Sequence, residues 1–202
     1  MADPLILRPV GAFEAVLGPS PEAIEAAGVF ARPLPNLRFA TVLARKGRMP
    51  ALAERVQALY GLEPPRSPRR VAAGETAFVA TGPGVWLAVN EAADPFWPEK
   101  LASELEGLAS VADQSDGYAA IRLEGPAVLD MLAKGVFLDL HLSTFPVGSA
   151  AGVSIAHIGI ILWRREAEVF ELLCFRSYAQ SFWHWIQESA AEYGLAVLPA
   201  AL

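Results

Sequence analysis

The order of its apolar segments constrains this chain more than any other sequence feature, because a similar series occurs twice. In each half, a short alternating segment precedes a helical pattern, a pair of strand-like segments and a second helical pattern. The parts of the first series lie at 37–43, 50–60, 76–89 and 98–108, and those of the second at 118–123, 126–134, 153–175 and 178–193. This order predicts an α+β fold of two ferredoxin-like halves that share a core.

Residues at the segment ends support this interpretation. Pro50 and Pro126 lie at the expected start of a helix, where the backbone N–H that proline lacks would have no partner in the helix. Ser177 and Gln180 have the spacing of a capping box. The expected hairpins pair 76–81 with 85–89 around Gly82-Pro83-Gly84, and 153–163 with 168–175. Gly61, Gly135 and Gly194 follow the expected helix ends.

The first 34 residues contain several prolines and few apolar periods, so we expect an extended arm with a short helix near 21–27. The chain therefore divides into an N-terminal arm at 1–34, a first α+β half at 35–113, and a second α+β half with the C-terminal helix at 114–202.

Charge and cysteine content exclude several partners. The formal net charge is −6, and the Lys and Arg residues form no dense block beyond 66–70, which argues against nucleic acid. The single Cys174 excludes an internal disulfide and suits a reducing cytoplasm. The N-terminal residues do not have the pattern of a signal peptide. The uncharged stretch 142–163 is interrupted by Pro and Gly, which argues against a membrane-spanning helix. We expect a cytoplasmic protein without a membrane partner.

The composition indicates a subunit of a larger assembly. Apolar residues make up 53% of the chain and charged residues only 19%. That balance leaves apolar surface that must be covered inside the chain or by a partner.

No motif indicates catalysis. The Gly82-Pro83-Gly84 turn lacks the third glycine of a nucleotide-binding fingerprint. Asp113 and Asp116 fit a polar turn in which Gly117 would supply a positive φ, and the apolar neighbours of Cys174 indicate core packing. Asp130, Asp139, His141 and His157 do not have the spacing of a metal site. We therefore predict no catalytic, cofactor-binding or metal-ligating residue.

The expected C-terminal helix carries an aromatic stripe on one face. Its members recur at helical spacing and are Tyr178, Phe182, Trp185, Ile186, Ser189 and Tyr193. Trp183 lies on the flank of this stripe and His184 lies opposite it, so both are candidates for a subunit interface. In the alternative, Trp183 folds back on a neighbouring strand and belongs to the core.

Several segments, in order along most of the chain, resemble the gamma subunits of heterotetrameric sarcosine oxidases. They are 80–84 with Trp86, 111–117 (VADQSDG), 121–126 (IRLEGP), 132–140 (LAKGVFLDL), 162–164 (LWR) and 170–185 (FELLCFRSYAQSFWHW). The resemblance implies a fold similar to part of the folate-binding aminomethyltransferase of the glycine-cleavage system.

The resemblance also implies a function within a complex. The expected partners are a large alpha subunit and the other subunits of the heterotetramer, which oxidises sarcosine to glycine and passes a one-carbon unit to tetrahydrofolate. FAD, FMN, NAD and tetrahydrofolate would be held by the larger subunits, with none in this chain. The alternatives are the equivalent subunit of another N-methyl amino acid dehydrogenase, a stand-alone folate-binding one-carbon transfer protein, and a scaffold unrelated to amine oxidation.

Overall fold

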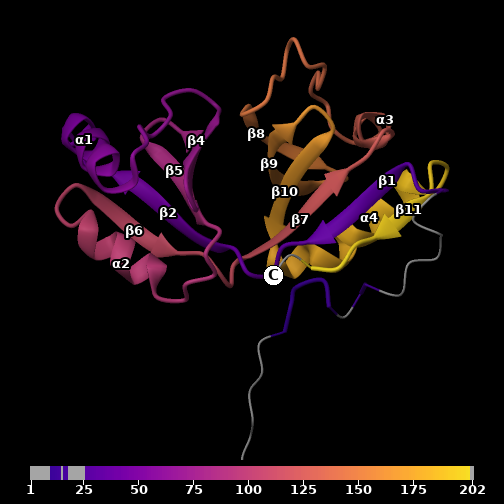
Figure 1. Ribbon diagram of the computed structural model, residues 1–202, viewed down its shortest axis with the longest axis horizontal. Coiled ribbons are helices and arrows are strands. Elements are labelled where there is room, and N and C mark those ends of the chain that lie inside the picture. Colours follow the sequence, from indigo (N-terminus) through magenta and orange to yellow (C-terminus); the bar gives the residue numbers. More distant parts are fainter. Residues whose placement is uncertain (1–9, 15, 18–25, 201–202) are drawn as a thin grey trace, which may run out of the picture.

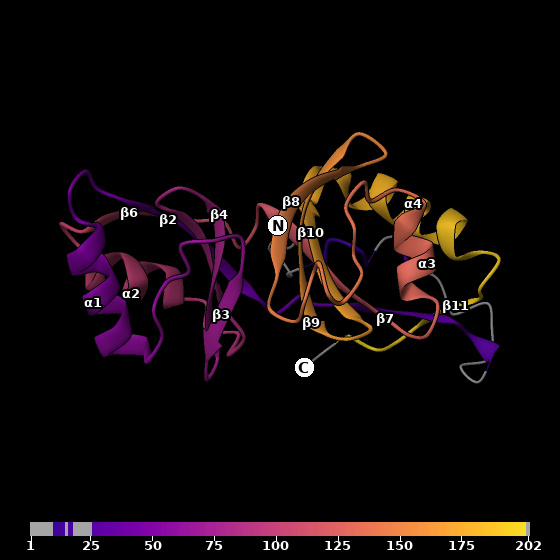
Figure 2. The ribbon, with the colours of Figure 1, turned by 90° about the horizontal axis from the view of Figure 1, so that it is seen from above.

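The computed structural model describes residues 10–14, 16–17 and 26–200, which form two β-sheets that lie face to face between two layers of helices (Figures 1 and 2). Helices α1 and α2 cover the outer face of one sheet, and α3 and α4 cover the outer face of the other. Within the described ranges, no helix is long and apolar enough to cross a membrane.

The first half contains a five-stranded antiparallel sheet with the order β3-β4-β5-β2-β6. Its elements are β2 (Arg38–Ala44), α1 (Met49–Tyr60), β3 (Arg70–Ala73), β4 (Thr76–Gly82), β5 (Val85–Asn90), α2 (Trp97–Glu104) and β6 (Ala109–Asp113). Without the edge strand β3, the order is that of a ferredoxin-like β-α-β-β-α-β unit. The edge strands β3 and β6 were not expected from the sequence, because both are short and only partly buried.

The second half contains a six-stranded sheet with the order β11-β1-β7-β10-β9-β8. Its elements are β1 (Val29–Pro33), β7 (Tyr118–Glu124), α3 (Val128–Ala133), β8 (Ala150–Ile155), β9 (Ile158–Glu166), β10 (Val169–Phe175), η2 (Arg176–Tyr178), α4 (Ala179–Ala190) and β11 (Leu195–Val197). The segment expected as an extended arm thus ends in β1, which pairs antiparallel with β7 and parallel with β11. The short helix expected near 21–27 falls mostly outside the described residues.

Two local expectations in the second half were wrong. The strand expected at 153–163 is divided into β8 and β9 by a tight turn in which Ala156 and His157 have φ values of 48° and 68°. Positive φ at both central positions is typical of a type I′ hairpin, but Ala and His do not indicate it. The capping box is also absent, because η2 precedes α4 and the N-cap Tyr178 makes no side-chain capping hydrogen bond.

Three apolar cores hold the layers together, and one of them is shared by the two halves. The first lies between the six-stranded sheet and helices α3 and α4, and the second between the five-stranded sheet and helices α1 and α2. The third lies between the sheets and includes Phe39, Val79 and Leu87 from one half with Trp163 and Leu173 from the other. The predicted α+β class, with two halves sharing a core, is confirmed.

Gly135 allows α3 and α4 to approach closely. A Cβ atom at this position would lie 2.7 Å from Cζ2 of the partly buried Trp185 ring. We therefore expect Gly135→Ala to lower the free energy of unfolding by about 1–3 kcal/mol, the usual cost of overpacking. Urea denaturation followed by circular dichroism measures the change.

Gly152→Ala is the matched control, because no atom lies within 4 Å of the Cβ position at Gly152 in β8. Equal stability of the two variants would contradict the proposed contact between Gly135 and Trp185.

Candidate functional site

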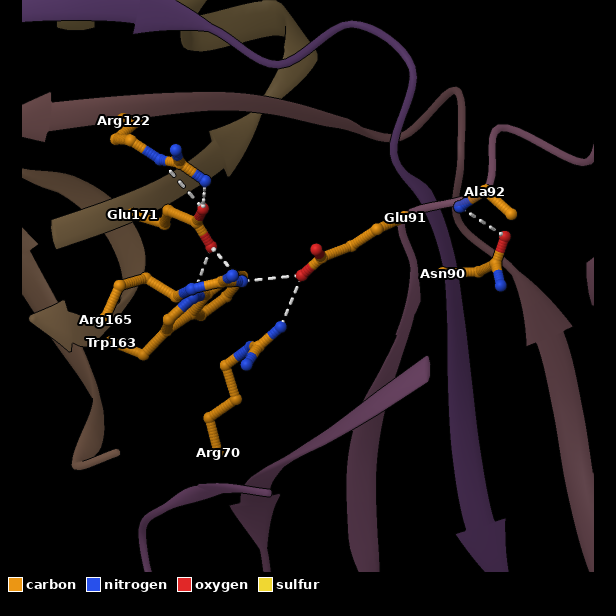
Figure 3. A network of polar contacts seen from close by, with 8 residues as sticks. All are labelled: Arg70, Asn90, Glu91, Ala92, Arg122, Trp163, Arg165 and Glu171. Carbon is orange, nitrogen blue, oxygen red and sulfur yellow. Dashed lines mark hydrogen bonds and ion pairs between the residues drawn. The ribbon is translucent and has the colours of Figure 1, made fainter. Parts of the chain in front are cut away.

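A buried carboxylate organises the polar contacts between the two sheets. Glu171 in β10 stands in register with Arg122 in β7 and Trp163 in β9, so the three side chains lie in one cross-strand row. The Glu171 side chain is 3% exposed. Its Oε1 accepts bonds from Arg122 Nε at 3.1 Å and Nη2 at 2.6 Å, and its Oε2 accepts from Trp163 Nε1 at 2.6 Å (Figure 3).

Residues of the first half complete this network. Glu91 follows β5, and its Oε1 lies 2.5 Å from Arg70 Nη2 and 2.6 Å from Arg165 Nη1. The same Arg165 nitrogen lies 3.5 Å from Glu171 Oε2, so Arg165 links the carboxylates of the two halves (Figure 3). The network thus fastens the halves to each other.

The pKa values of two arginines in the network are shifted in opposite directions. Burial acts to lower the pKa of Arg165, but Glu171 and Glu91 outweigh it and the net pKa is raised. For Arg70, burial and the neighbouring Arg165 lower the pKa despite the attraction of Glu91. Both carboxylates are held by guanidinium groups, which suits a structural role better than proton transfer.

A buried arginine supports the segment between α3 and β8. Arg164 is 1% exposed and its Nη1 donates to the carbonyl oxygens of Leu140 at 2.9 Å and Phe145 at 2.7 Å. Its Nε donates to the Ala167 carbonyl at 3.1 Å, and its guanidinium lies 4.9 Å from the centre of the Phe170 ring. Backbone carbonyls and an aromatic face therefore accommodate this charge.

The segment supported by Arg164, residues 136–149, carries the most exposed aromatic side chain among the described residues. We call it the 136–149 loop. Phe137 is 96% exposed. The other exposed large apolar side chains of the loop are Leu138, Leu142 and Val147. This outer surface of the loop is the candidate interface.

A cavity lies where the chain passes between the halves. Its volume is about 690 Å³, and it is lined by the N-terminal segment, the connection between β1 and β2, and the start of β7. Among its polar residues, Arg176 donates to the Val10 carbonyl and Ser115 bonds to Asp113. Within the described ranges, no group of three or more His, Cys, Asp or Glu residues is placed to hold a metal ion.

The candidate interface residues Trp183 and His184 differ in exposure. Trp183 is 3% exposed and belongs to the core beneath α4, as the alternative interpretation expected. His184 points to the exposed side of α4. Only His184 therefore offers a partner substantial side-chain surface, and its contact with a partner stays a prediction.

Asp113 and Asp139 accept backbone hydrogen bonds in local turns, whereas Asp130 lies in helix α3. Asp113 Oδ1 accepts from the N–H of Ser115 at 2.8 Å, but Gly117 does not have the positive φ that we expected. Asp139 Oδ1 accepts from the N–H of His141 at 2.9 Å, and this bond is the main reason why the pKa of Asp139 is lowered. These carboxylates shape local turns.

The fold defines a class of protein: two α+β halves, each a sheet with helices on its outer face, joined by a shared apolar core (Figure 1). The same fold occurs in the glycine cleavage system aminomethyltransferase T of Bartonella henselae, with 12% identity and a TM-score of 0.58 over 86% of this chain and 48% of that one.

The family model described as sarcosine oxidase, gamma subunit family, matches residues 46–192. The sarcosine oxidase gamma subunit from Corynebacterium sp. (strain U-96) is 29% identical over 179 residues, which cover 87% of each chain. The gamma subunit from Corynebacterium sp. (strain P-1) is 29% identical over 118 residues, which cover 58% of each chain. A chain of the heterotetrameric sarcosine oxidase from Corynebacterium sp. U-96, solved with pyrrole 2-carboxylate, matches with 25% identity and a TM-score of 0.77, covering 92% of this chain and 96% of that one. The protein belongs to the sarcosine oxidase gamma subunit family.

Sequence reasoning did not find Phe137, Arg164 or Glu171 as functional residues. All three lie within segments that carry the family resemblance, at 132–140, 162–164 and 170–185. Glu171 meets Arg122 of another strand and Arg164 meets carbonyls of the 136–149 loop, and spacing along the chain reveals neither these contacts nor the exposure of Phe137.

Removal of the central carboxylate should weaken the whole fold. We expect Glu171→Ala to lower the free energy of unfolding by about 1–3 kcal/mol, because it leaves the buried Trp163 Nε1 and the partly buried Arg122 without their acceptor. Urea denaturation measures this change. In the control Glu63→Ala, which removes a partner of an ion pair that is more than 60% exposed, the change should stay below about 1 kcal/mol. Similar losses in both variants would contradict the central role of Glu171.

The buried Cys174 should resist thiol reagents in the native protein. Burial raises the pKa of its thiol to about 12, so the reactive thiolate is scarce at pH 8. We expect a thiol-specific chromogenic reagent to label about one thiol per chain in denaturant and almost none without it. Rapid labelling of the folded chain at pH 8 would contradict the burial of this residue.

Proposed function

We propose that this chain is the non-catalytic gamma subunit of a heterotetrameric sarcosine oxidase. The observation that carries the proposal is the match of nearly the whole chain to nearly the whole of one chain of such an enzyme, at a TM-score of 0.77. The correspondence covers 92% of this chain and 96% of that one.

The contacts within the chain support a structural role. Glu171 and Glu91 neutralise arginines at the junction of the halves, and Asp113 and Asp139 bond to nearby backbone N–H groups. Several large apolar side chains are exposed on the free chain and would gain by burial against a partner. The proposed contribution is therefore a rigid shape with apolar contact area.

In the proposed assembly, a large alpha subunit and the other larger subunits hold FAD, FMN, NAD and tetrahydrofolate. Those groups supply the oxidation of sarcosine to glycine, the reduction of oxygen to hydrogen peroxide and the acceptance of the one-carbon unit. The chain described here would stabilise these neighbours in the cytoplasm. An assembly that acts on another N-methyl amino acid fits the same contacts, because the proposed role of this chain involves no contact with the substrate.

A second candidate is a stand-alone folate-binding one-carbon transfer protein. It is favoured by the likeness to the aminomethyltransferase fold and by the cavity of about 690 Å³. A shared fold alone does not determine function, so this candidate rests on the cavity. Calorimetry of the isolated chain with tetrahydrofolate tests it, and saturable binding would favour it over the structural subunit.

Co-expression tests the leading proposal. We expect a tagged chain, produced with the larger sarcosine oxidase subunits from the same source, to retain them on an affinity column. The retained material should show flavin absorbance and consume oxygen when sarcosine is added. Absence of a stable complex at micromolar concentration would contradict the proposal.

A further inference from the structure

The structure points to one anchor in the proposed assembly: we propose that Phe137 of the 136–149 loop inserts into an apolar pocket on a larger subunit. This inference rests on the proposed function and adds the surface and the kind of pocket that it meets.

Phe137 exposes an unusually large apolar surface. Its side chain is 96% exposed, and Leu138, Leu142 and Val147 of the same loop are also exposed. Single exposed apolar residues are common on protein surfaces, but an exposed aromatic ring within a group of apolar side chains is typical of an interaction site. Aromatic residues at the centre of such sites provide much of the binding free energy.

The loop is held in place from below, so the ring is presented by a rigid support. Val136, Leu140 and Phe145 point inward and belong to the core of the second half. The buried Arg164 fixes the carbonyl groups of Leu140 and Phe145, on the chain beyond the exposed ring. A group already held in one position loses less conformational freedom on binding.

Bonds within the loop add to this rigidity. The N–H of Phe145 donates to the carbonyl of His141 at 2.8 Å, and His141 Nδ1 lies 2.8 Å from Ser143 Oγ. The carboxylate of Asp139 is occupied by the N–H of His141. The turn next to Phe137 is therefore fixed by its own polar groups.

The loop also contacts both halves of the molecule. The N–H of Arg70 in β3 donates to the Gly148 carbonyl at 2.7 Å, and Arg69 forms an isolated β-bridge with Ser149. The other end of the loop continues from α3, where the N–H of Val136 donates to Leu132 at 2.8 Å. A partner bound at the loop would thus contact a segment braced by both sheets.

The charge of the loop identifies the kind of pocket. Asp139 is the only formally charged residue between 135 and 148, and its carboxylate already accepts a hydrogen bond within the loop. An uncharged pocket lined by aliphatic or aromatic side chains is complementary to this surface.

A larger subunit fits this description better than a second copy of the chain. The cavity of about 690 Å³ is lined by Glu14, Arg38, Asp116 and Arg176 as well as by apolar residues. Insertion of Phe137 from a second copy into that cavity would be a head-to-tail contact, which forms a ring or an open filament.

The test compares Phe137→Ser with Phe96→Ser. Phe96 is 74% exposed in the first half and has Asp94 and Glu99 close to it along the chain, so it serves as a matched exposed aromatic. Each full-length variant is titrated against the purified larger subunits by calorimetry. We expect Phe137→Ser to weaken binding about 30-fold or more, and Phe96→Ser to change it less than about 3-fold.

The outcomes separate this inference from the proposed function. If the unsubstituted chain binds and Phe137→Ser binds equally well, the anchor is refuted while the subunit role stands. If the unsubstituted chain does not bind, the proposed function fails and the inference fails with it. Self-association of the unsubstituted chain that Phe137→Ser abolishes, measured by analytical ultracentrifugation, would assign the ring to a second copy and overturn the proposal. Thermal denaturation verifies that both variants are folded.

Discussion

The buried Glu171 carboxylate is the interaction on which the arrangement of the two halves depends. It lies in a row with Trp163 and Arg122 across three strands and connects through Arg165 to Glu91 and Arg70 of the other half. A carboxylate excluded from water is stable only when its partners stay in place, so the network favours a single relative position of the sheets. The core between the sheets buries apolar surface, and the network adds a preference for one relative position of the two sheets.

Much of this architecture could be predicted from the sequence, because helices and hairpins are specified by residues close together along the chain. The helix that starts next to Pro50 and ends at Gly61, and the hairpin around Gly82-Pro83-Gly84, form as expected. The missing parts depend on distant contacts: β1 becomes a strand only because β7 and β11 flank it. The turn at Ala156 and His157 could not be foreseen, because the pair is not one of the Asn-Gly, Asp-Gly or Gly-Gly pairs that mark such a turn.

The site was less predictable than the fold. Trp183 had the aromatic character of an interface residue, yet it packs in the core, while Phe137 in the loop between α3 and β8 gave no periodic signal and is almost fully exposed. The loop that carries Phe137 is held by Arg164, whose guanidinium donates to the carbonyls of Leu140 and Phe145. A long-range contact of this kind has no signature in local spacing.

Family membership and the internal contacts support the proposed account, in which this chain lends shape and apolar area to the larger subunits of an assembly. The most direct test is native mass spectrometry of the assembly purified from the source cells through a tag on this chain. The account predicts a single heterotetramer with one copy of the chain and three different partners. Recovery of the chain only alone or as multiples of itself would contradict it.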